Sequence, residues 1–592
     1  MNTLFTIEPK SLSSIDFLIN VPVYQRPYCW EKEQVEKLLN DFKDNIREET
    51  YFIGNIISIK NFNSYDLIDG QQRLTTLWII CLYFSKYNPN ILTFCKVNNN
   101  SRLSFSIRKT TNNYLNNLLN QKLDQEGYWI INRYLPSKEL EENNDSSLEQ
   151  NHYIASVFRI IDQWVKDNLT EDSSIQEFSN FVYNKVSFQF LVAPANTDEN
   201  KLFIQINTNG TQFQHYDILK AELLNCLSEN DKTKYAEIWE KAAFPYFIRS
   251  LKDNDNNTIS KSVNNKSIKD LVDLAHPLSF NKQQKQTNTI QSPNYQYITY
   301  FNTLLIHTLF IYCKKQKLPL PSSFNLERLL EIFKEFRKSI SSTEPDRESI
   351  GVEFLDTLSK VRKIIDTNFI FKDLRQNEFN LLPTQIEQNQ DSDFDDLHDT
   401  QEDTNIDRQS LEQLQRMLYH NNNDNKHFWL GIFLDQYIIN GNPSIDQLEK
   451  IDNILSLSER SLSAYTKYFQ DTEDFLNHKE TLSISELPLK FTEINRYWFY
   501  KIEYLLWKQT HKNDYYIVSR TSKEHILPQS QKDYYKMNGI DIDDFGNLIL
   551  ITTSENSGFS NKNLLEKFEY QKKLKNPPLK MIHFYETLEK IN

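Results

Sequence analysis

The stretch YDLIDGQQRLTTLWIICLYF, from Tyr65 to Phe84, decides the fold of the first part of the chain. Its first apolar residues are typical of a β-strand, Gly70 then permits a tight turn, and helical patterning follows. Two other runs are also typical of strands, YFIGNIISI at 51–59 and VSFQFLVA at 186–193. Because helical patterns separate these runs, the sequence predicts an α/β domain over residues 1–225.

The helix that begins at about Gln71 has the features of an anion site at its start. The N–H groups of a first helical turn attract phosphate groups. Arg73 could pair with a phosphate through two hydrogen bonds, Asp69 could bind a metal ion or a ribose hydroxyl, and Thr75 or Thr76 could add a hydroxyl contact. The segment is not a P-loop, because GxxxxGK[ST] does not occur in the chain. It therefore predicts a site for a nucleotide or a DNA phosphate.

A simpler alternative is that Gln71, Gln72 and Arg73 only cap the helix and form a salt bridge. Another segment favours the ligand site: VPVYQRPYCW at Val21–Trp30 is a polar and aromatic loop that its prolines stiffen. Aromatic side chains there could stack on a base, although aromatics beside prolines are more often part of a core. The loop predicts contacts with a mark on DNA from three residues, Tyr24, Gln25 and Arg26.

Near the other end of the chain, EHILPQ at Glu524–Gln529 and GNLILITTSEN at Gly546–Asn556 predict a metal-dependent nuclease site. His525 could deprotonate a water molecule, and Asn547, at the start of an apolar run typical of a second hairpin strand, could orient its imidazole. Glu524 and Asn556 are the candidate ligands of Mg²⁺ or Mn²⁺. Neighbours on a strand point to opposite sides, so Glu524 and His525 share a site only where the strand bends. A lone Glu-His pair would be structural; the joint spacing of the two motifs favours the nuclease.

The segment after Asn556 predicts a helix with a polar start and several lysines. The whole chain has a formal net charge of −13, so affinity for nucleic acid must come from local basic faces. Residues 501–592 hold 14 Lys and Arg against 12 Asp and Glu. Solvation of a helix face is the alternative role for any one of these lysines. Four of them are predicted to neutralise DNA phosphates, Lys562, Lys567, Lys572 and Lys573.

The middle of the chain predicts scaffold rather than site. Helical patterns occur at Tyr297–Lys315, Gln409–His420 and Lys426–Ile439. Residues Asp391–Asp407 carry eight acidic side chains and no Lys or Arg, which is typical of a solvated linker. An EF-hand calcium loop from Asp391 to Glu402 is the alternative, but Asp396 stands where that loop needs glycine. We expect a helical scaffold at 226–385, an acidic linker at 386–410, a helical segment at 411–500 and a nuclease domain at 501–592.

The cysteines and the apolar runs limit the class of protein. Five cysteines are scattered without a CxxC pair, which argues against a disulfide framework and against a structural zinc. The N-terminus lacks a basic head followed by an apolar core, and the longest apolar runs fall far short of the roughly 18 residues that span a membrane. We therefore expect a soluble, cytoplasmic protein without a membrane partner.

Taken together, the motifs resemble one family. VPVYQRPYCW, YFIGNI, DGQQRLTTL and the segment ENKLFIQINTNGTQFQHYDILK at 199–220, followed by EHILPQ and GNLILIT, are similar to the GmrSD family of modification-dependent restriction endonucleases. The resemblance implies an α+β, largely helical protein in which a ParB/sulfiredoxin-like DGQQR domain precedes a ββα-metal, HNH-type nuclease domain. It also implies that an NTP, GTP or another nucleotide, is bound and hydrolysed. One departure is Asn209, which stands where the family has Arg. The residues that the resemblance assigns to the nucleotide are Asp69, Gly70, Gln71, Gln72, Arg73 and Thr75.

These features lead to a hypothesis with two alternatives. The chain is expected to be a phage-defence enzyme that senses modified double-stranded DNA through its nucleotide-binding domain and cuts that DNA with His525. A homodimer is one possible state. The first alternative is a nucleotide-switched DNA-binding protein with a degenerate HNH module, because Asn556 is a weaker ligand than His. The second is a nuclease that acts on RNA.

Overall fold

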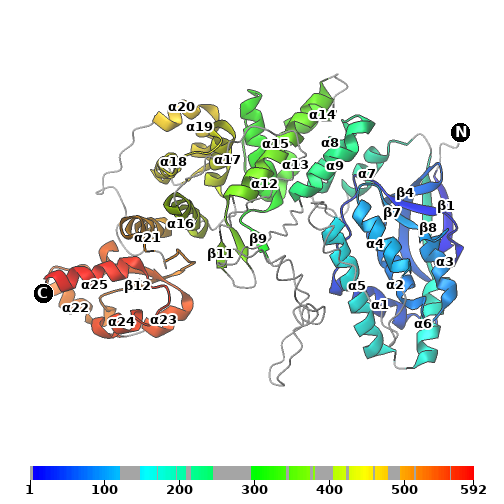
Figure 1. Cartoon of the computed structure of the whole chain (residues 1–592), viewed down its shortest axis with the longest axis horizontal. Helices are drawn as coiled ribbons and strands as arrows, with labels where there is room; N and C mark the ends of the chain where they lie inside the picture. The colour runs from blue at the N-terminus through cyan, green and yellow to red at the C-terminus, as the bar shows by residue number, and fades with distance from the viewer. Residues whose placement is uncertain are drawn as a thin grey trace. The chain divides into compact units, whose positions relative to one another are not determined.

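The computed structural model describes residues 5–120, 147–169, 171–194, 197–208, 215–243, 295–341, 346–373, 378–380, 405–421, 426–457, 460–477, 494–512, 515–559 and 562–591. The chain forms two compact units, the first from residues 1–292 and 327–359 and the second from residues 293–326 and 360–592. Figure 1 labels the helices and strands of each unit. The predicted α+β, largely helical class is confirmed; the ParB-like and ββα-metal assignments stay predictions.

A six-stranded mixed sheet forms the centre of the first unit, in the order β1-β8-β3-β4-β2-β7. The hairpin β3–β4 and the pair β1–β8 are antiparallel, whereas β3–β8, β2–β4 and β2–β7 are parallel. All three strands predicted from apolar runs are present. The strands are β1 (Thr6–Ser11), β2 (Leu18–Val21), β3 (Tyr51–Asn61), β4 (Ser64–Asp69), β7 (Leu103–Phe105) and β8 (Val186–Ala193).

Helix α2 (Gln71–Phe84) is the central helix of this unit, and it begins at the residue predicted from the sequence. All of its residues except Gln72 and Arg73 are buried, because LWIICLYF is apolar on every side and other helices enclose it. Each large apolar side chain removed from water contributes about 1.5–3 kcal/mol, so this helix fixes the core. The other helices of the core are α1 (Lys32–Asp44), α3 (Leu92–Cys95), α4 (Lys109–Asn120), α5 (Ser147–Asn168) and α6 (Asp172–Asn184).

Further helices of the first unit pack around helix α8 (His215–Asn225), which carries Lys220. Arg337 of α14 (Lys334–Ser341) is paired with Glu222 of α8 at 2.5 Å, so a segment far along the chain returns to this unit. Residues Asn209 and Gly210 of the segment singled out in the sequence lie outside the described residues. The remaining helices here are α7 (Glu199–Thr208), α9 (Glu229–Ala243), α13 (Leu329–Ile332) and the first part of α15 (Arg347–Asn368).

The second unit begins with a helical segment whose core is aromatic. Tyr465 packs its ring against those of Phe310, Phe428 and Phe469 at centroid distances of 4.9–5.0 Å. The three helices predicted from patterns are present. One of them, α16, begins earlier than expected, inside the predicted linker 386–410. The candidate calcium loop lies outside the described residues. The elements are α12 (Phe301–Lys315), α16 (Asn405–Asn421), α17 (Phe428–Asn440), α18 (Ile445–Leu457), α19 (Leu462–Gln470), α20 (Thr472–Asn477), α21 (Arg496–Thr510), β9 (Tyr295–Tyr297), β10 (Phe371–Asp373) and β11 (Glu378–Asn380).

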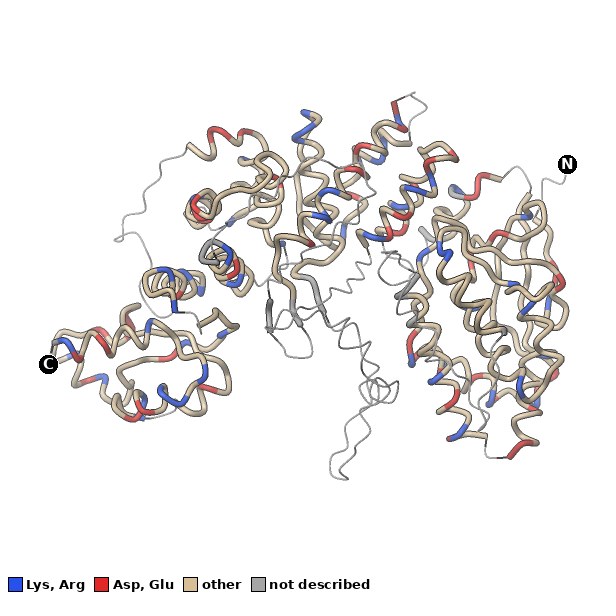
Figure 2. Tube along the Cα trace, viewed as in Figure 1, with Lys and Arg blue, Asp and Glu red and all other residues tan. Residues whose placement is uncertain are grey.

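The C-terminal module, from β12 to α25, is a pair of antiparallel strands with a short helix between them in the chain, followed by further helices. Strand β12 (Ser522–His525) pairs antiparallel with β13 (Leu548–Ile551), and His525 lies opposite Leu548. Two helices, and not one, follow: α23 (Thr553–Phe559) begins before Asn556, and α24 (Leu564–Gln571) begins anew at the capping box formed by Asn563. Basic and acidic residues are interspersed along the module (Figure 2). Its other helices are α22 (Lys532–Met537) and α25 (Leu579–Ile591).

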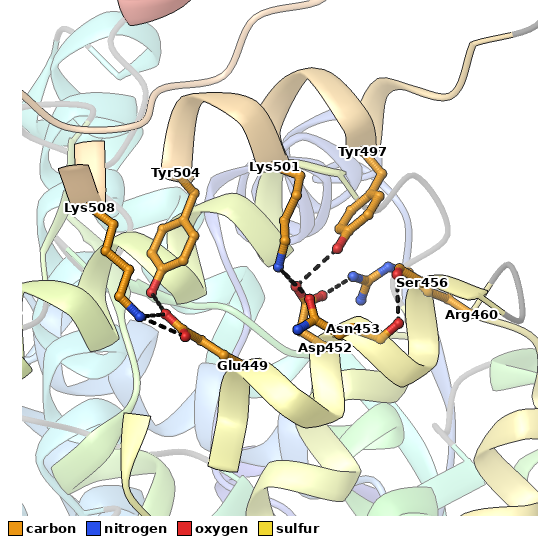
Figure 3. A network of polar contacts seen from close by, with 9 residues as sticks. All are labelled: Glu449, Asp452, Asn453, Ser456, Arg460, Tyr497, Lys501, Tyr504 and Lys508. Atoms are coloured by element: carbon orange, nitrogen blue, oxygen red, sulfur yellow. Dashed lines mark hydrogen bonds and ion pairs between the residues drawn. The ribbon is translucent and has the colours of Figure 1, made fainter. Parts of the chain in front are cut away.

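A network of charged side chains anchors α21, the helix that leads into this module, on α18 (Figure 3). The buried carboxylate of Asp452 accepts hydrogen bonds from Tyr497 at 2.9 Å and Lys501 at 2.7 Å, and it is paired with Arg460. Burial alone would raise the pKa of Asp452, but Arg460 and Lys501 outweigh it and lower that pKa. A second carboxylate, Glu449, accepts from Lys508 at 2.7 Å. The approach to the hairpin is therefore held by ion pairs as well as by packing.

The cysteines and the apolar helices of the described residues bear on the expected class of protein. None of the five cysteines, all of them described, forms a disulfide. Among the helices that the structure describes, none combines the length and the apolar character needed to cross a bilayer.

Candidate functional site

His525 lies at the end of β12, with its side chain 7% exposed, and is held by a carboxylate. Its Nε2 atom is 2.9 Å from Oδ1 of Asp543, and Oδ2 of Asp543 is 3.1 Å from the ammonium group of Lys532. The hydrogen bond with His525 and the charge of Lys532 lower the pKa of Asp543. A carboxylate only accepts hydrogen bonds, so Nε2 carries the proton of this contact, and in a neutral ring Nδ1 would be the basic atom. This is the arrangement that a general base needs.

Asn547 does not hold the imidazole in the way the sequence predicted. Its Oδ1 accepts from the backbone N–H of Leu527 at 2.7 Å, and its Nδ2 donates to the carbonyl of Ile542 at 2.8 Å. The amide therefore ties the turn that follows His525 to the residue that precedes Asp543. Asp543 makes the side-chain contact that we expected of Asn547, and Asn547 positions both partners through the backbone.

Glu524 and His525 point to different partners, as expected for neighbours on a strand. The carboxylate of Glu524 is 2.6 Å from the ammonium group of Lys567, which also donates to the carbonyl of His525 at 2.5 Å. Because the Lys567 side chain is only 2% exposed, its burial argues against the predicted contact with DNA phosphates. Lys567 instead neutralises Glu524 and supports the strand end that carries His525.

Glu524 and Asn556 are the two residues that the sequence predicts as metal ligands. Asn556 is exposed on α23, and the carboxylate of Glu524 is already paired with a buried cation. Within the residues that the structure describes, no group of three or more His, Cys, Asp and Glu could hold a metal ion. The side chains as they are arranged do not form a site for Mg²⁺ or Mn²⁺, because hard cations need several oxygen ligands directed at one point.

The other three lysines predicted to contact DNA lie next to α24, Lys562 shortly before it and Lys572 and Lys573 directly after it. Lys562 donates to the carbonyl of Gly558, and its ammonium group lies 4.7 Å from the ring centre of Tyr570. Lys572 is paired with Glu569 at 2.9 Å, and Lys573 is exposed. Lys562 is half-buried, whereas Lys572 and Lys573 are exposed, and exposed ammonium groups can exchange a surface partner for a phosphate at low cost.

In the N-terminal domain, the turn before α2 has the predicted conformation. Gly70 precedes the helix with φ of +95°, a left-handed conformation that favours glycine. Arg73 donates to the carbonyl of Ile53 at 2.9 Å and lies 3.3 Å from Asp69. Gly54 has φ of +101°, and a Cβ there would lie 2.6 Å from Nη1 of Arg73. The salt bridge of the simpler alternative is therefore present, and glycine makes room for it.

The loop VPVYQRPYCW is bound along this turn, as the joint use of the two segments suggested. Gln25 donates to the carbonyls of Leu67 and Ile68 at 3.1 and 2.9 Å. Gln72 donates to the carbonyl of Pro27 at 3.0 Å. Tyr24 and Gln25 are almost completely buried, so the predicted contact of their side chains with a DNA mark would require the loop to open. As described, these two residues belong to the core, which was the alternative; Arg26 is half-buried.

Several buried polar atoms beside these two segments have no hydrogen-bond partner among the residues that the structure describes. Gln71 and Thr75, two of the residues assigned to the nucleotide, leave Nε2 and Oγ1 without a partner. Buried polar atoms in folded proteins are almost always bonded, so such a group points to a ligand or an ordered water. Three further residues have buried side-chain atoms of this kind, and sequence reasoning missed them because no motif marks them. They are Arg108 (Nε and Nη1), Gln150 (Nε2) and Asn151 (both amide atoms).

Comparison with known protein families accounts for both ends of the chain. Residues 10–224 match the model of the GmrSD restriction endonuclease, N-terminal domain, and residues 483–589 match that of the GmrSD restriction endonucleases, C-terminal domain. A search of curated proteins finds no match. The two matched ranges cover more than half of the chain and contain both groups of residues described above. The chain therefore belongs to the GmrSD family of restriction endonucleases.

Proposed function

We propose that this restriction endonuclease cuts modified double-stranded DNA with His525 as its general base, and that a nucleotide bound near Gln71 licenses the cut. The observation that carries the catalytic part is the pair formed by His525 and Asp543 at the end of a hairpin that Asn547 and Lys567 hold in place. Family membership supplies DNA cleavage as the reaction class.

In the proposed reaction, Nδ1 of His525 takes a proton from a water molecule, and the water oxygen attacks the phosphorus of a DNA phosphodiester. The bond from phosphorus to the leaving oxygen breaks, and that oxygen is protonated from solvent. Asp543 stabilises the imidazolium that forms, because a carboxylate at hydrogen-bond distance favours the charged ring. If Mg²⁺ or Mn²⁺ takes part, as in the metal-dependent reaction expected from the sequence, Glu524 would have to leave Lys567 to bind it.

For the N-terminal domain, the proposed ligand is an NTP whose phosphates lie at the start of α2. The unpartnered Nε2 of Gln71 and Oγ1 of Thr75 would be satisfied by phosphate oxygens or by water bound to them. Asp69 and Arg73 would hold the turn, and Gly70 would give it its shape. Recognition of modified DNA is a part of the proposal that comes from the family resemblance, and a homodimer stays one possible state of the chain.

A panel of DNA substrates tests the proposal. The full chain is incubated with Mg²⁺ or Mn²⁺ and with unmodified, glucosylated and phosphorothioate DNA, each with and without GTP or ATP. We expect cleavage of one modified DNA that depends on one nucleotide. Equal cleavage of every DNA without nucleotide would overturn the licensing step, and cleavage of RNA alone would make the protein a ribonuclease.

The second candidate function is a nucleotide-switched DNA-binding protein that does not cut. The pairing of Glu524 with the buried Lys567 favours it, because this contact removes a candidate metal ligand. If Glu524 is a metal ligand, the Glu524→Gln variant should need a higher Mn²⁺ concentration for cleavage than the wild type does. Cleavage by the variant with an unchanged Mn²⁺ requirement would remove the metal role. Binding of DNA by the wild type without any cleavage would establish the second candidate.

A further inference from the structure

Three buried charged side chains meet beneath the loop that contains Gln25. Arg108 precedes α4, Lys220 is in α8 and Glu240 is in α9; their side chains are 0%, 1% and 2% exposed. One carboxylate oxygen of Glu240 is paired with the ammonium group of Lys220, and the other lies 3.1 Å from Nη2 of Arg108. Glu240 thus connects two cations inside the N-terminal domain.

These charges are connected to the proposed nucleotide site through Gln25. The carbonyl of Gln25 accepts from Nη2 of Arg108 at 3.0 Å and from Lys220 at 3.4 Å. The side chain of the same residue is bonded to the carbonyls of Leu67 and Ile68, directly before Asp69. One residue therefore contacts the cations with its backbone and the end of β4 with its side chain.

The cluster is not satisfied by the protein. Nε and Nη1 of Arg108 are buried and have no hydrogen-bond partner in the described part of the chain, although a guanidinium group can donate five hydrogen bonds. Burial lowers the pKa of Lys220, and the charges of Glu240 and Asp217 oppose that effect. Burial would raise the pKa of Glu240, but Lys220 and Arg108 lower it, so the carboxylate stays ionised. A buried fork of donors beside an ammonium group is the arrangement that binds phosphate.

We propose that Arg108 and Lys220 form a subsite for a phosphoryl group of the nucleotide, and that Glu240 occupies this subsite until the phosphoryl group displaces it. This inference rests on the proposed function, whose nucleotide site it extends. A carboxylate and a phosphate use the same donors, so they compete for them. Displacement of Glu240 changes what holds α9, the last described helix before residue 244, and so gives the bound nucleotide an effect beyond its own site.

The test is a titration of the full chain with inorganic phosphate and with pyrophosphate, followed by calorimetry. Glu240→Gln keeps the shape of the side chain and removes the competing charge, so we expect pyrophosphate to bind at least about tenfold more tightly than to the wild type. Lys220→Met should abolish the binding. The matched control is Glu229→Gln, on the same helix but 85% exposed, which should bind as the wild type does.

A different result is expected if Arg108, Lys220 and Glu240 form an ion cluster that only stabilises the fold. Glu240→Gln would then lose stability, bind pyrophosphate no more tightly than the wild type, and overturn the proposal. If Glu240→Gln does not fold in phosphate-free buffer, recovery of its fold on addition of pyrophosphate supports the subsite. If the fold is not recovered, Glu240→Asp is measured instead, and an unchanged affinity for pyrophosphate in the folded Glu240→Asp variant overturns the proposal. Pyrophosphate should also speed hydrogen exchange of the α9 amides in the wild type. The proposed function fails separately, by the absence of any DNA cleavage, and that result would leave the affinity of Glu240→Gln for pyrophosphate as it was measured.

Discussion

The two candidate sites differ in how their polar groups are satisfied. In the C-terminal module, the Asp543 carboxylate contacts the His525 imidazole and the Asn547 amide is bonded to the backbone at both ends. In the N-terminal domain, Gln71 and Thr75 leave buried atoms without a partner among the described residues. Groups that are already bonded hold a catalytic geometry in the absence of substrate. Groups that lack a partner cost stability until a ligand binds, so ligand binding there should stabilise the domain.

The largest expected effect breaks the C-terminal site. His525→Ala removes the general base, and we expect cleavage to fall by about 10²–10⁴-fold while thermal stability and DNA binding stay near those of the wild type. The measurement is the initial rate of cleavage of the DNA that the wild type cuts. His583→Ala, an exposed histidine of the same module, is the control and should keep the wild-type rate. A wild-type rate in His525→Ala would end the assignment of the base.

A smaller effect is expected for Asp543→Asn, which leaves the base in place and removes the charge that positions it. We expect a loss of about 10²-fold. Thermal stability should stay near that of the wild type, because the Asp543 side chain is 32% exposed and an ion pair of that kind contributes little to stability. Asp533→Asn, on the exposed side of α22, should change neither the rate nor the stability. A reduced rate that is accompanied by a marked loss of thermal stability would show that Asp543 only supports the fold.

Two adjacent threonines of α2 sharpen the comparison from the N-terminal side. The Thr75 hydroxyl has no protein partner, whereas the Thr76 hydroxyl lies 2.7 Å from that of Tyr28 and donates to the carbonyl of Gln72 at 2.9 Å. Thr75→Val should weaken nucleotide binding by about 5–10-fold and leave the melting temperature unchanged or higher, because it removes an unmet polar group. Thr76→Val should do the reverse: lower the melting temperature and keep most of the affinity. Equal behaviour of the two variants in calorimetry and thermal melting would contradict the ligand role of Thr75.

Local patterns predicted the parts of the molecule that depend on neighbours in sequence. Apolar runs located β8 at its observed bounds, and Gly70 with the apolar run after it located the first residue of α2. The motif residues around His525 could also be found, because Glu524 and His525 end one strand and Asn547 directly precedes the apolar run of the other. Asp543 could not, since it lies outside both strands, and its path back to His525 past α22 depends on tertiary packing.

The same limit explains the errors over charged residues. Whether a lysine faces solvent or a buried carboxylate depends on which helix packs on which strand, so the local pattern predicted the same role for Lys567 as for the exposed Lys573. Arg108 and Glu240 carry no motif, and they meet only because α4, α8 and α9 surround one loop. Tertiary packing, rather than residue type, therefore decides which group each charged side chain contacts.

The smallest expected effect concerns pH and the C-terminal module alone. Lys580 donates to the carbonyls of Phe545 and Leu548, on either side of Asn547, and burial lowers its pKa from 10.5 to about 7. Between those two values the unfolded chain binds the proton and the folded chain does not, so this residue makes the module more stable as pH rises from about 7. Below that pH both states carry the charge and the contribution is constant. Lys580→Met should therefore melt with a smaller rise in stability between pH 7 and 9 than the wild type, whereas Lys590→Met, at the exposed end of α25, should keep the wild-type slope. Identical slopes in urea unfolding of the wild type and Lys580→Met would show that the ammonium group stays charged, and that the loop carrying Asn547 is held by a cation throughout this range.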